Sequence, residues 1–276
     1  MEFKLLGKTD VRIAAIGMGT WGIGGFGTRN TSADRLQAEA LRRGIDLEMI
    51  HIDTAESYAA GHSEEVVGEA IRGLRDRVFI ATKVSPEHFH YDDVIKAAEG
   101  SLRRLGVSYV DLYQLHWPNN RIPIQETMKA MEHLLEKGKI RFIGVSNFSV
   151  NEMREAQEAL SNAEIVSNQV EYSLMERDIE PELLPYCEKE RVTVIAYSPL
   201  ARGDLLSGKS RRVLHTISVK NDRTPAQVAL NWLITKSNVV AIPKAAKVEH
   251  LQENAGAAGW RISSQDAAIL EQAFTR

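Results

Sequence analysis

The sequence predicts a (β/α)8 barrel made by one domain over residues 1–276. Eight short apolar segments, typical of buried parallel strands, alternate with helical segments along the chain. No Pro- or Ser-rich linker and no run of charge interrupts this alternation. A chain of 276 residues is long enough for eight strand–helix units in a single domain.

A β-hairpin is expected before the barrel, in the segment FKLLGKTDVRI around a GKTD turn. We expect it to lie across the amino-terminal mouth and close the bottom of the barrel. Helix starts are indicated by Ser32 before ADRLQAEALRR, by Ser63 before EEVVGEAIRGL and by Pro123 before IQETMKAMEHLLEKG. The eight barrel strands are predicted at residues 14–20, 51–55, 78–84, 110–116, 140–147, 165–172, 193–199 and 239–244.

The composition is that of an ordinary globular protein, with 43% hydrophobic residues, 26% charged residues and a net charge of −3. This charge without a basic block argues against a nucleic-acid or anionic membrane partner. The opening MEFKLLGKTD has no apolar signal region, and no apolar run approaches the ~20 residues of a membrane helix, so a cytoplasmic location is expected. The single Cys187 is expected to be a partly buried helical thiol rather than a nucleophile.

Four polar residues follow or end apolar segments in a way that predicts an active site. Asp53 and Tyr58 lie in HIDTAESY, Lys83 in VFIATKV and His116 in VDLYQLHWP. Because the carboxyl ends of parallel barrel strands meet at one edge, these side chains are expected to gather there.

These residue types fit one acid–base device. A phenol has an unperturbed pKa of about 10 and needs a nearby cation to become an effective acid near neutrality. We therefore expect Tyr58 to be the proton donor, Lys83 to lower its pKa and Asp53 to hold the lysine. A histidine on the next strand is suited to orient the reacting oxygen.

The segment Gly17–Gly22 also matches the dinucleotide-binding pattern G-x-G-x-x-G. A Rossmann turn must lead directly into a helix, whereas IGGFG follows here, and its glycines disfavour a helix. We expect instead a flexible first loop that presents Trp21 over the site. An exposed loop tryptophan without a role is the alternative.

The chain resembles the aldo-keto reductase family along its whole length. The motifs that carry the resemblance are GMGTW, HIDTAESY, ATKV, DLYQLHWP, GVSNF, NQVEY, AYSPL and IPKAAKVEHLQEN, one after another in family order. The resemblance implies NAD(P)H-dependent reduction of aldehydes and ketones, with the catalytic tetrad Asp53, Tyr58, Lys83 and His116. It implies no metal. A small carbonyl compound is the expected partner, and a monomer or weak oligomer is expected.

The resemblance also implies a set of cofactor contacts. Ser146, Asn147 and Gln169 would hold the nicotinamide carboxamide, and Tyr197 would stack on the nicotinamide ring. Asn147 as a helix cap and Tyr197 as a core residue are the structural alternatives. Ser198, Leu200 and Asp204 resemble the pyrophosphate segment, and Lys244 resembles the residue that reaches the 2′-phosphate. The remaining contacts implied are Gly19, Thr20, Trp21, Asp53, Ala245, His250, Glu253 and Asn254.

Cofactor choice is where the sequence departs from the family pattern. NADP-selective members usually carry a small hydroxyl residue after the lysine and an arginine six positions further on, and this chain has Ala245 and His250 there. The bidentate arginine contact to phosphate is therefore missing. Lys244 remains, Lys247 is an additional cation, and a protonated His250 is a further source of positive charge. NADP(H) is the expected cofactor, with NAD(H) also accepted.

Substrate selectivity is expected to rest on Trp21, Tyr58, His116 and Trp117. The segment ARGDLLSGKS is short, and the chain stops close to its final helix, which together predict an open mouth and broad specificity. His62 is expected to be a solvated loop residue, with a substrate-facing position as the alternative.

Two other functions are alternatives to carbonyl reduction. A metal-dependent hydrolase needs clustered ligands at strand ends, and the only H-x-H, His88-Phe89-His90, lies in a loop beyond the third strand. A non-catalytic NADPH-binding redox sensor or regulatory subunit would keep the same barrel. The intact tetrad favours turnover over that alternative.

Overall fold

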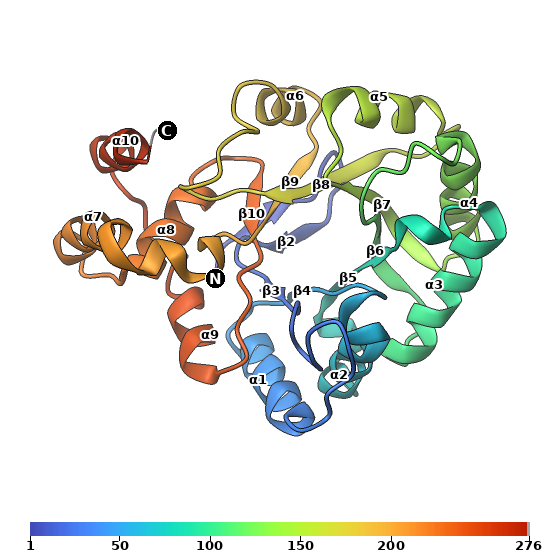
Figure 1. Ribbon diagram of the computed structural model, residues 1–276, viewed down its shortest axis with the longest axis horizontal. Coiled ribbons are helices and arrows are strands. Elements are labelled where there is room, and N and C mark those ends of the chain that lie inside the picture. Colours follow the sequence, from blue (N-terminus) through green and yellow to red (C-terminus); the bar gives the residue numbers. More distant parts are fainter. Residues whose placement is uncertain (275–276) are drawn as a thin grey trace.

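The computed structural model describes residues 1–274 and contains eight parallel strands that follow one another in chain order around a curved sheet (Figure 1). Parallel bridges of Ile16 with Ala241 and of Gly19 with Lys244 join the first strand region to the last and close the barrel. The predicted (β/α)8 fold is confirmed. Its strands are β3 (Met18–Gly19), β4 (His51–Asp53), β5 (Phe79–Val84), β6 (Val110–Leu115), β7 (Ile140–Ser146), β8 (Ile165–Glu171), β9 (Thr193–Tyr197) and β10 (Val239–Ala241).

The predicted hairpin is also present, with β1 (Phe3–Leu5) antiparallel to β2 (Arg12–Ala14). Leu6 and Ile13 are fully buried and pack inside the barrel with residues such as Val166. The side chain of Lys4 donates hydrogen bonds to the main-chain oxygens of three residues that precede or begin β10, namely Ile234, Lys236 and Val239. The hairpin therefore closes the amino-terminal end of the barrel, as expected.

The first barrel strand is much shorter than the predicted 14–20. Ala14 pairs within the hairpin, and the amide of Ala15 donates to the carbonyl of Glu2. Only Met18 and Gly19 remain in β3. The apolar segment serves two sheets in succession, and hydrophobicity alone does not separate them.

In the described part of the chain, residues 1–274, eight helices alternate with the barrel strands and two more lie outside this pattern. Helices α7 and α10 contact each other and lie at one edge of the molecule, away from the sheet (Figure 1). Within residues 1–274, none of the helices has the length and hydrophobicity required to cross a membrane. The helices are α1 (Asp34–Asp46), α2 (His62–Ile71), α3 (Tyr91–Leu105), α4 (Ile124–Glu136), α5 (Val150–Glu158), α6 (Leu183–Lys189), α7 (Gly208–Lys220), α8 (Pro225–Ile234), α9 (Val248–Ala255) and α10 (Ser264–Ala273).

The predicted helix starts differ in their outcomes. Pro123 directly precedes α4, as expected. Ser32 lies two residues before α1, whose N-cap is Ala33. Ser63 is not a cap, because α2 already begins at His62 after a left-handed Gly61. The Ser63 hydroxyl instead donates to the hydroxyl of Thr20 at 3.0 Å, inside the protein.

The core consists of two apolar clusters, and the buried residues between them and the cavity are largely polar. Apolar side chains fill the space between sheet and helices, and a second apolar cluster fills the lower interior of the barrel. The upper interior contains several buried polar or charged side chains, among them Asp53, Lys83, Gln114, Ser146 and Gln169. A buried polar group is costly unless it is hydrogen-bonded. This layer is where the four candidate residues meet.

Candidate active site

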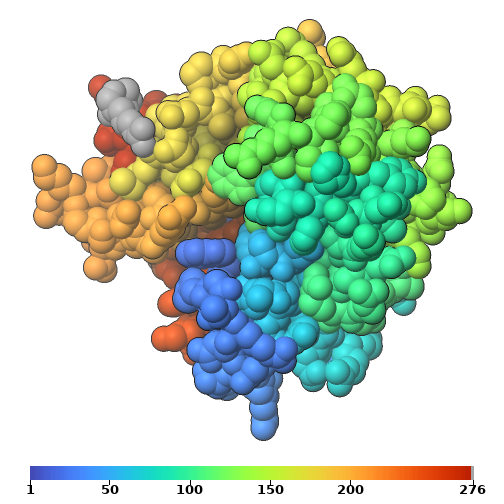
Figure 2. All heavy atoms as spheres, turned by 45° about the vertical axis from the view of Figure 1, so that its right-hand side comes forward, coloured from blue at the N-terminus to red at the C-terminus, as the bar shows by residue number. Residues whose placement is uncertain are grey.

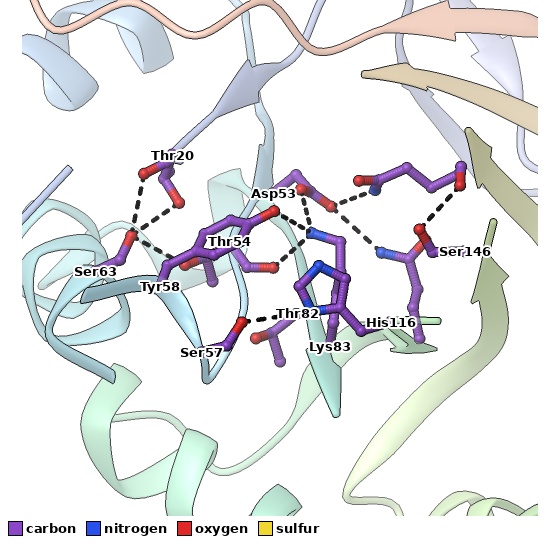
Figure 3. A network of polar contacts seen from close by, with 12 residues as sticks. Thr20, Asp53, Thr54, Ser57, Tyr58, Ser63, Thr82, Lys83, His116 and Ser146 are labelled. Carbon is purple, nitrogen blue, oxygen red and sulfur yellow. Dashed lines mark hydrogen bonds and ion pairs between the residues drawn. The ribbon is translucent and has the colours of Figure 1, made fainter. Parts of the chain in front are cut away.

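The four predicted catalytic side chains lie together at the carboxyl edge of the sheet (Figure 3). Asp53 ends β4, Lys83 lies near the end of β5, and His116 directly follows β6. Tyr58 begins a short turn after β4, in which Ala59 and Ala60 have positive φ angles of 51° and 55°. All four line or lie directly beneath one cavity.

Lys83 is fully buried, and its ammonium group has three partners. It donates to Asp53 Oδ1 at 2.5 Å, to the main-chain oxygen of Thr54 at 2.8 Å and to Tyr58 Oη at 3.4 Å. Burial alone would lower the pKa of Lys83, but the charges and hydrogen bonds of Asp53 and Tyr58 outweigh it and the pKa is raised. Lys83 is therefore a permanent cation at neutral pH.

The pKa of Tyr58 is raised from its ordinary value, and not lowered as the sequence suggested. Burial of the phenol raises it, and the nearby Lys83 ammonium opposes this only in part. Removing a phenol from water disfavours its anion. The consequence is a tyrosine that holds its proton at neutral pH and whose oxygen accepts a hydrogen bond from the cation that would stabilise the phenolate.

His116 is a neutral imidazole in this setting. Burial first, and the charge of Lys83 second, lower its pKa to about 3. Its ring stacks edge-on against Tyr58 with centroids 5.7 Å apart, and its Nδ1 lies 3.4 Å from Ser57 Oγ. A neutral ring has one N–H, so His116 can donate a single directed hydrogen bond into the cavity.

Asp53 is held on both oxygens. Its Oδ2 accepts hydrogen bonds from Gln169 Nε2 at 2.7 Å and Gln114 Nε2 at 3.3 Å, while Oδ1 accepts from Lys83. Gln114 was missed in the sequence, although its position two residues before His116 on the same strand was a usable signal. Gln169, which is predicted to hold the carboxamide, lines the cavity and also donates from its amide nitrogen to Asp53.

The cavity above these residues has a volume of about 690 Å³. Most of the predicted contact residues line it, including Trp117 and the cofactor candidates Gly19, Thr20, Trp21, Asp53, Ser146, Asn147, Gln169, Tyr197, Ser198, Leu200 and Lys244. On this face the blue amino-terminal segment lies beside the orange segment that follows β9 (Figure 2). The cavity therefore opens between the first loop and the β9–α7 segment.

Asn147 and Tyr197 lie at the cavity wall and contact each other. The hydroxyl of Tyr197 donates to Asn147 Oδ1 at 3.0 Å, and Asn147 Nδ2 donates to the main-chain oxygen of His116 at 3.2 Å. The alternative of Asn147 as a helix cap is wrong, because Ser149 caps α5 in a reciprocal pair with Glu152. Tyr197 is partly exposed at the cavity and is not a core residue.

Five of the predicted cofactor residues lie outside the cavity lining. Asp204 faces a neighbouring hollow shared with Glu171 and Glu176. Ala245 is buried beside the exposed Lys244, and the others lie on α9, with His250 exposed, Glu253 partly buried and Asn254 buried. Ala245 and the three α9 residues therefore follow Lys244, which lines the cavity, in the sequence.

Among the cavity residues that the sequence did not indicate, two contact Trp21. Phe26 stacks edge-on against Trp21 with centroids 5.1 Å apart, and Arg202 places its guanidinium carbon 6.0 Å from the Trp21 ring centre. Both lie in irregular segments with several positive φ angles. Side-chain direction in such segments follows from the individual backbone angles, so periodicity gives no signal for them.

His62 is neither solvated nor directed at the cavity, and both expectations for it are wrong. Only 4% of the residue is exposed. Its Nε2 lies 2.9 Å from Asp34 Oδ2, and its Nδ1 lies 2.7 Å from Glu65 Oε2. Cys187 is fully buried, and burial raises the pKa of its thiol to about 12, which leaves it unreactive.

The residues of the H-x-H segment pair with carboxylates separately. His88 lies 2.9 Å from Glu56, and His90 lies 3.2 Å from Glu126. Over the described residues 1–274, no group of three or more His, Cys, Asp or Glu side chains is arranged to hold a metal ion.

Comparison with known proteins places this geometry in a family. The chain is 43% identical over 267 residues to methylglyoxal reductase YeaE of Escherichia coli, covering 96% of this chain and 92% of that protein. The thermostable aldo-keto reductase Tm1743, solved with the inhibitor epalrestat, superposes with a TM-score of 0.94 at 46% identity, covering 99% of each chain. An aldo/keto reductase from Klebsiella pneumoniae, solved with NADP and acetate, superposes with a TM-score of 0.90 at 40% identity, covering 98% of this chain and 95% of that one.

Residues 15–274 match the sequence profile of the Aldo/keto reductase family. The matched segment includes the barrel and all four predicted catalytic residues. The family of these relatives, the shared fold and the profile agree. The chain belongs to the aldo/keto reductase family and is an oxidoreductase.

Proposed function

We propose that this protein is a carbonyl reductase that uses NADPH to reduce aldehydes and ketones to alcohols. The observation that carries the proposal is the chain of contacts from Asp53 through Lys83 to Tyr58, placed beside a neutral His116 at the floor of the cavity. A reductase of carbonyl groups needs a proton donor and a group that orients oxygen at one point, and this arrangement supplies both.

The residues around the cavity fit a nicotinamide cofactor. The Tyr197 ring offers a flat surface, while Asn147 and Ser146 present amide and hydroxyl groups beside it. Lys244 is exposed at the far edge, where a phosphate would find a cation. The Klebsiella relative solved with NADP supports NADP(H), and the absence of an arginine at position 250 leaves room for NAD(H) use.

When bound, dihydronicotinamide supplies a hydride to the carbonyl carbon. His116 donates its single N–H to the carbonyl oxygen and fixes its direction. As negative charge develops on that oxygen, Tyr58 transfers its phenolic proton to it, and the Lys83 ammonium at 3.4 Å stabilises the phenolate left behind. Asp53 keeps Lys83 charged and in place through its 2.5 Å contact.

The substrate class proposed is small aldehydes, including 2-oxoaldehydes of the methylglyoxal type. The similarity to a methylglyoxal reductase supports this, and so does the mixture of aromatic and polar groups in the lining. Trp21 and Trp117 are about half exposed, at 53% and 49%, so they offer apolar surface at an open mouth. Broad acceptance of aldehydes follows from a wall with few directed polar contacts.

The test is steady-state oxidation of NADPH by purified protein with methylglyoxal, an aromatic aldehyde and an aliphatic aldehyde. We expect turnover with all three, within about a thousandfold in kcat/KM, which is ~4 kcal/mol. Tight NADPH binding without any oxidation would overturn the proposal and favour a redox sensor or regulatory subunit.

A further inference from the structure

We propose that His62 is a positioning residue which, as an imidazolium ion, clamps the glycine-rich segment 22–29 to the start of α2 and so sets the cavity wall made by Trp21 and Phe26. The inference rests on the proposed carbonyl reductase function for its kinetic readout. Its structural readout is independent of that function.

Each ring nitrogen of His62 contacts a carboxylate, and the two carboxylates come from different helices. Nε2 lies 3.0 and 2.9 Å from the two oxygens of Asp34, the first residue of α1. Nδ1 lies 2.7 Å from Glu65, in the first turn of α2. Arg29 of the first loop lies 3.1 Å from the same Glu65 oxygen. One buried ring therefore joins the first loop, α1 and α2.

The geometry requires the charged form of the ring. Ionised carboxylates only accept hydrogen bonds, and a neutral imidazole donates from one nitrogen and presents a lone pair at the other. With both nitrogens within 3.0 Å of a carboxylate, only the doubly protonated ring donates to both. Loss of one proton turns one of the two contacts from attraction into repulsion.

The charged groups around the His62 ring sum to zero when the ring itself is charged. Asp34 and Glu65 are the two anions, and Arg29 is the second cation. On the other side of the α2 start, Arg104 pairs with the fully buried Glu64 at 2.6 Å, so that pair is satisfied separately. The charge of His62 is therefore matched to Asp34 and Glu65, and the neutral ring would leave a net negative cluster.

The clamp reaches the cavity through the loop backbone. A Cβ on Gly24 would lie 3.0 Å from Cδ2 of His62, so the loop rests directly on the ring. The amide of Gly24 also donates to Gln37 of α1 at 2.8 Å. On either side of Gly24 lie Trp21 and Phe26, which stack on each other and line the cavity. A shift of the His62 ring would therefore shift Trp21 and Phe26 at the cavity.

Tyr58 depends on the clamp much less. Its hydroxyl is held by Lys83, and its amide donates to the carbonyl of Ala55. A loosened clamp should therefore raise the KM for the carbonyl substrate and change kcat little. A role in folding alone would lower thermal stability and leave KM unchanged.

The experiment compares wild type with His62→Asn and Asp34→Asn between about pH 5 and about pH 9. In wild type the aldehyde KM should rise severalfold with pH. His62→Asn should show the raised KM at every pH. Asp34→Asn should keep a low KM throughout, because an asparagine side chain can accept from the charged ring or donate to the neutral one. Asp46→Asn, the same change at the other end of α1, is the control and should behave as wild type.

A second readout uses the loop itself, through acrylamide quenching of Trp21 fluorescence, with Trp21→Phe to subtract the other tryptophans. Quenching should increase with pH in wild type and stay constant in Asp34→Asn. If His62→Asn keeps the wild-type pH dependence of KM and quenching, or if it only lowers the melting temperature, the inference is wrong. If no variant reduces any aldehyde while quenching behaves as stated, the proposed function fails and the clamp stands.

Discussion

The two ends of the barrel each hold a lysine, and the two lysines differ in the charge of their partners. Lys4 at the closed end donates to three neutral main-chain oxygens, and burial lowers its pKa to about 8. Lys83 at the open end is more deeply buried, yet its pKa is raised because Asp53 and Tyr58 lie against it. One buried carboxylate therefore decides whether a buried lysine is a weakly basic structural donor or a permanent cation.

Two histidines of the barrel interior share a lowered pKa and differ instead in their access to the cavity. His51 at the start of β4 is fully buried with no partner on either ring nitrogen, and burial lowers its pKa to about 4. His116 at the open end reaches into the cavity, and burial together with Lys83 lowers its pKa to about 3. Both rings are neutral at physiological pH, but only His116 has access to a substrate.

The largest expected effect is that of Tyr58→Phe, which removes the proton donor at the open end. We expect kcat to fall about 10²–10⁴-fold, the usual contribution of general acid catalysis, while the dissociation constant for NADPH stays nearly unchanged. Steady-state kinetics and fluorescence titration with NADPH measure the two. Retention of a tenth of wild-type kcat would mean that another group is the acid.

Asp53→Asn leaves Lys83 with neutral partners only, like those of Lys4 at the closed end of the barrel. Without the carboxylate, Lys83 keeps only neutral partners, so its pKa should fall as that of Lys4 does. We expect a drop in kcat of about 10- to 100-fold that grows as pH rises, measured as a kcat–pH profile. Lys4→Met is the matched control at the other end and should leave the shape of this profile unchanged.

The lowered pKa of His51 predicts that the folded protein loses stability in acid. Its pKa is about 4 in the folded chain against 6.5 for an ordinary histidine, so the unfolded chain binds more protons between these values. The free energy of unfolding should therefore fall as pH drops from about 6.5 towards about 4. His51→Gln should remove roughly 2 kcal/mol of this loss between about pH 7 and about pH 5, measured by urea denaturation. An unchanged pH slope would show that His51 is not responsible.

The smallest effect concerns the exposed edge of the cavity, where Lys244 is solvated. His250→Arg adds a planar cation on the first turn of α9 beyond Lys244. We expect the KM for NADPH to fall a few-fold and that for NADH to stay constant, because solvent weakens an exposed ion pair. His215→Arg on α7 introduces the same charge elsewhere and should change neither value. Equal effects on both cofactors would place His250 away from the 2′-phosphate.

The sequence alone determined the barrel, the closing hairpin and the strand ends that carry Asp53, Lys83 and His116. These follow from the alternation of short apolar segments with helical segments, which is a local property, and from the rule that parallel barrel strands end at one edge. It failed at residues 14–20, because one apolar run there serves both hairpin and barrel. It also misplaced the start of α2, because Gly61 rather than Ser63 ends the preceding turn.

Only the tertiary structure decided the state of the titrating groups and the partners of His62. Whether burial or a neighbouring charge sets a pKa depends on distances between segments far apart in the chain, as for Lys83 and Asp53 or His116 and Lys83. Asp34 and His62 are 28 positions apart, and nothing in either local sequence indicates that they meet. Local pattern specifies which elements form, but charge balance in the interior is specified by the way those elements pack.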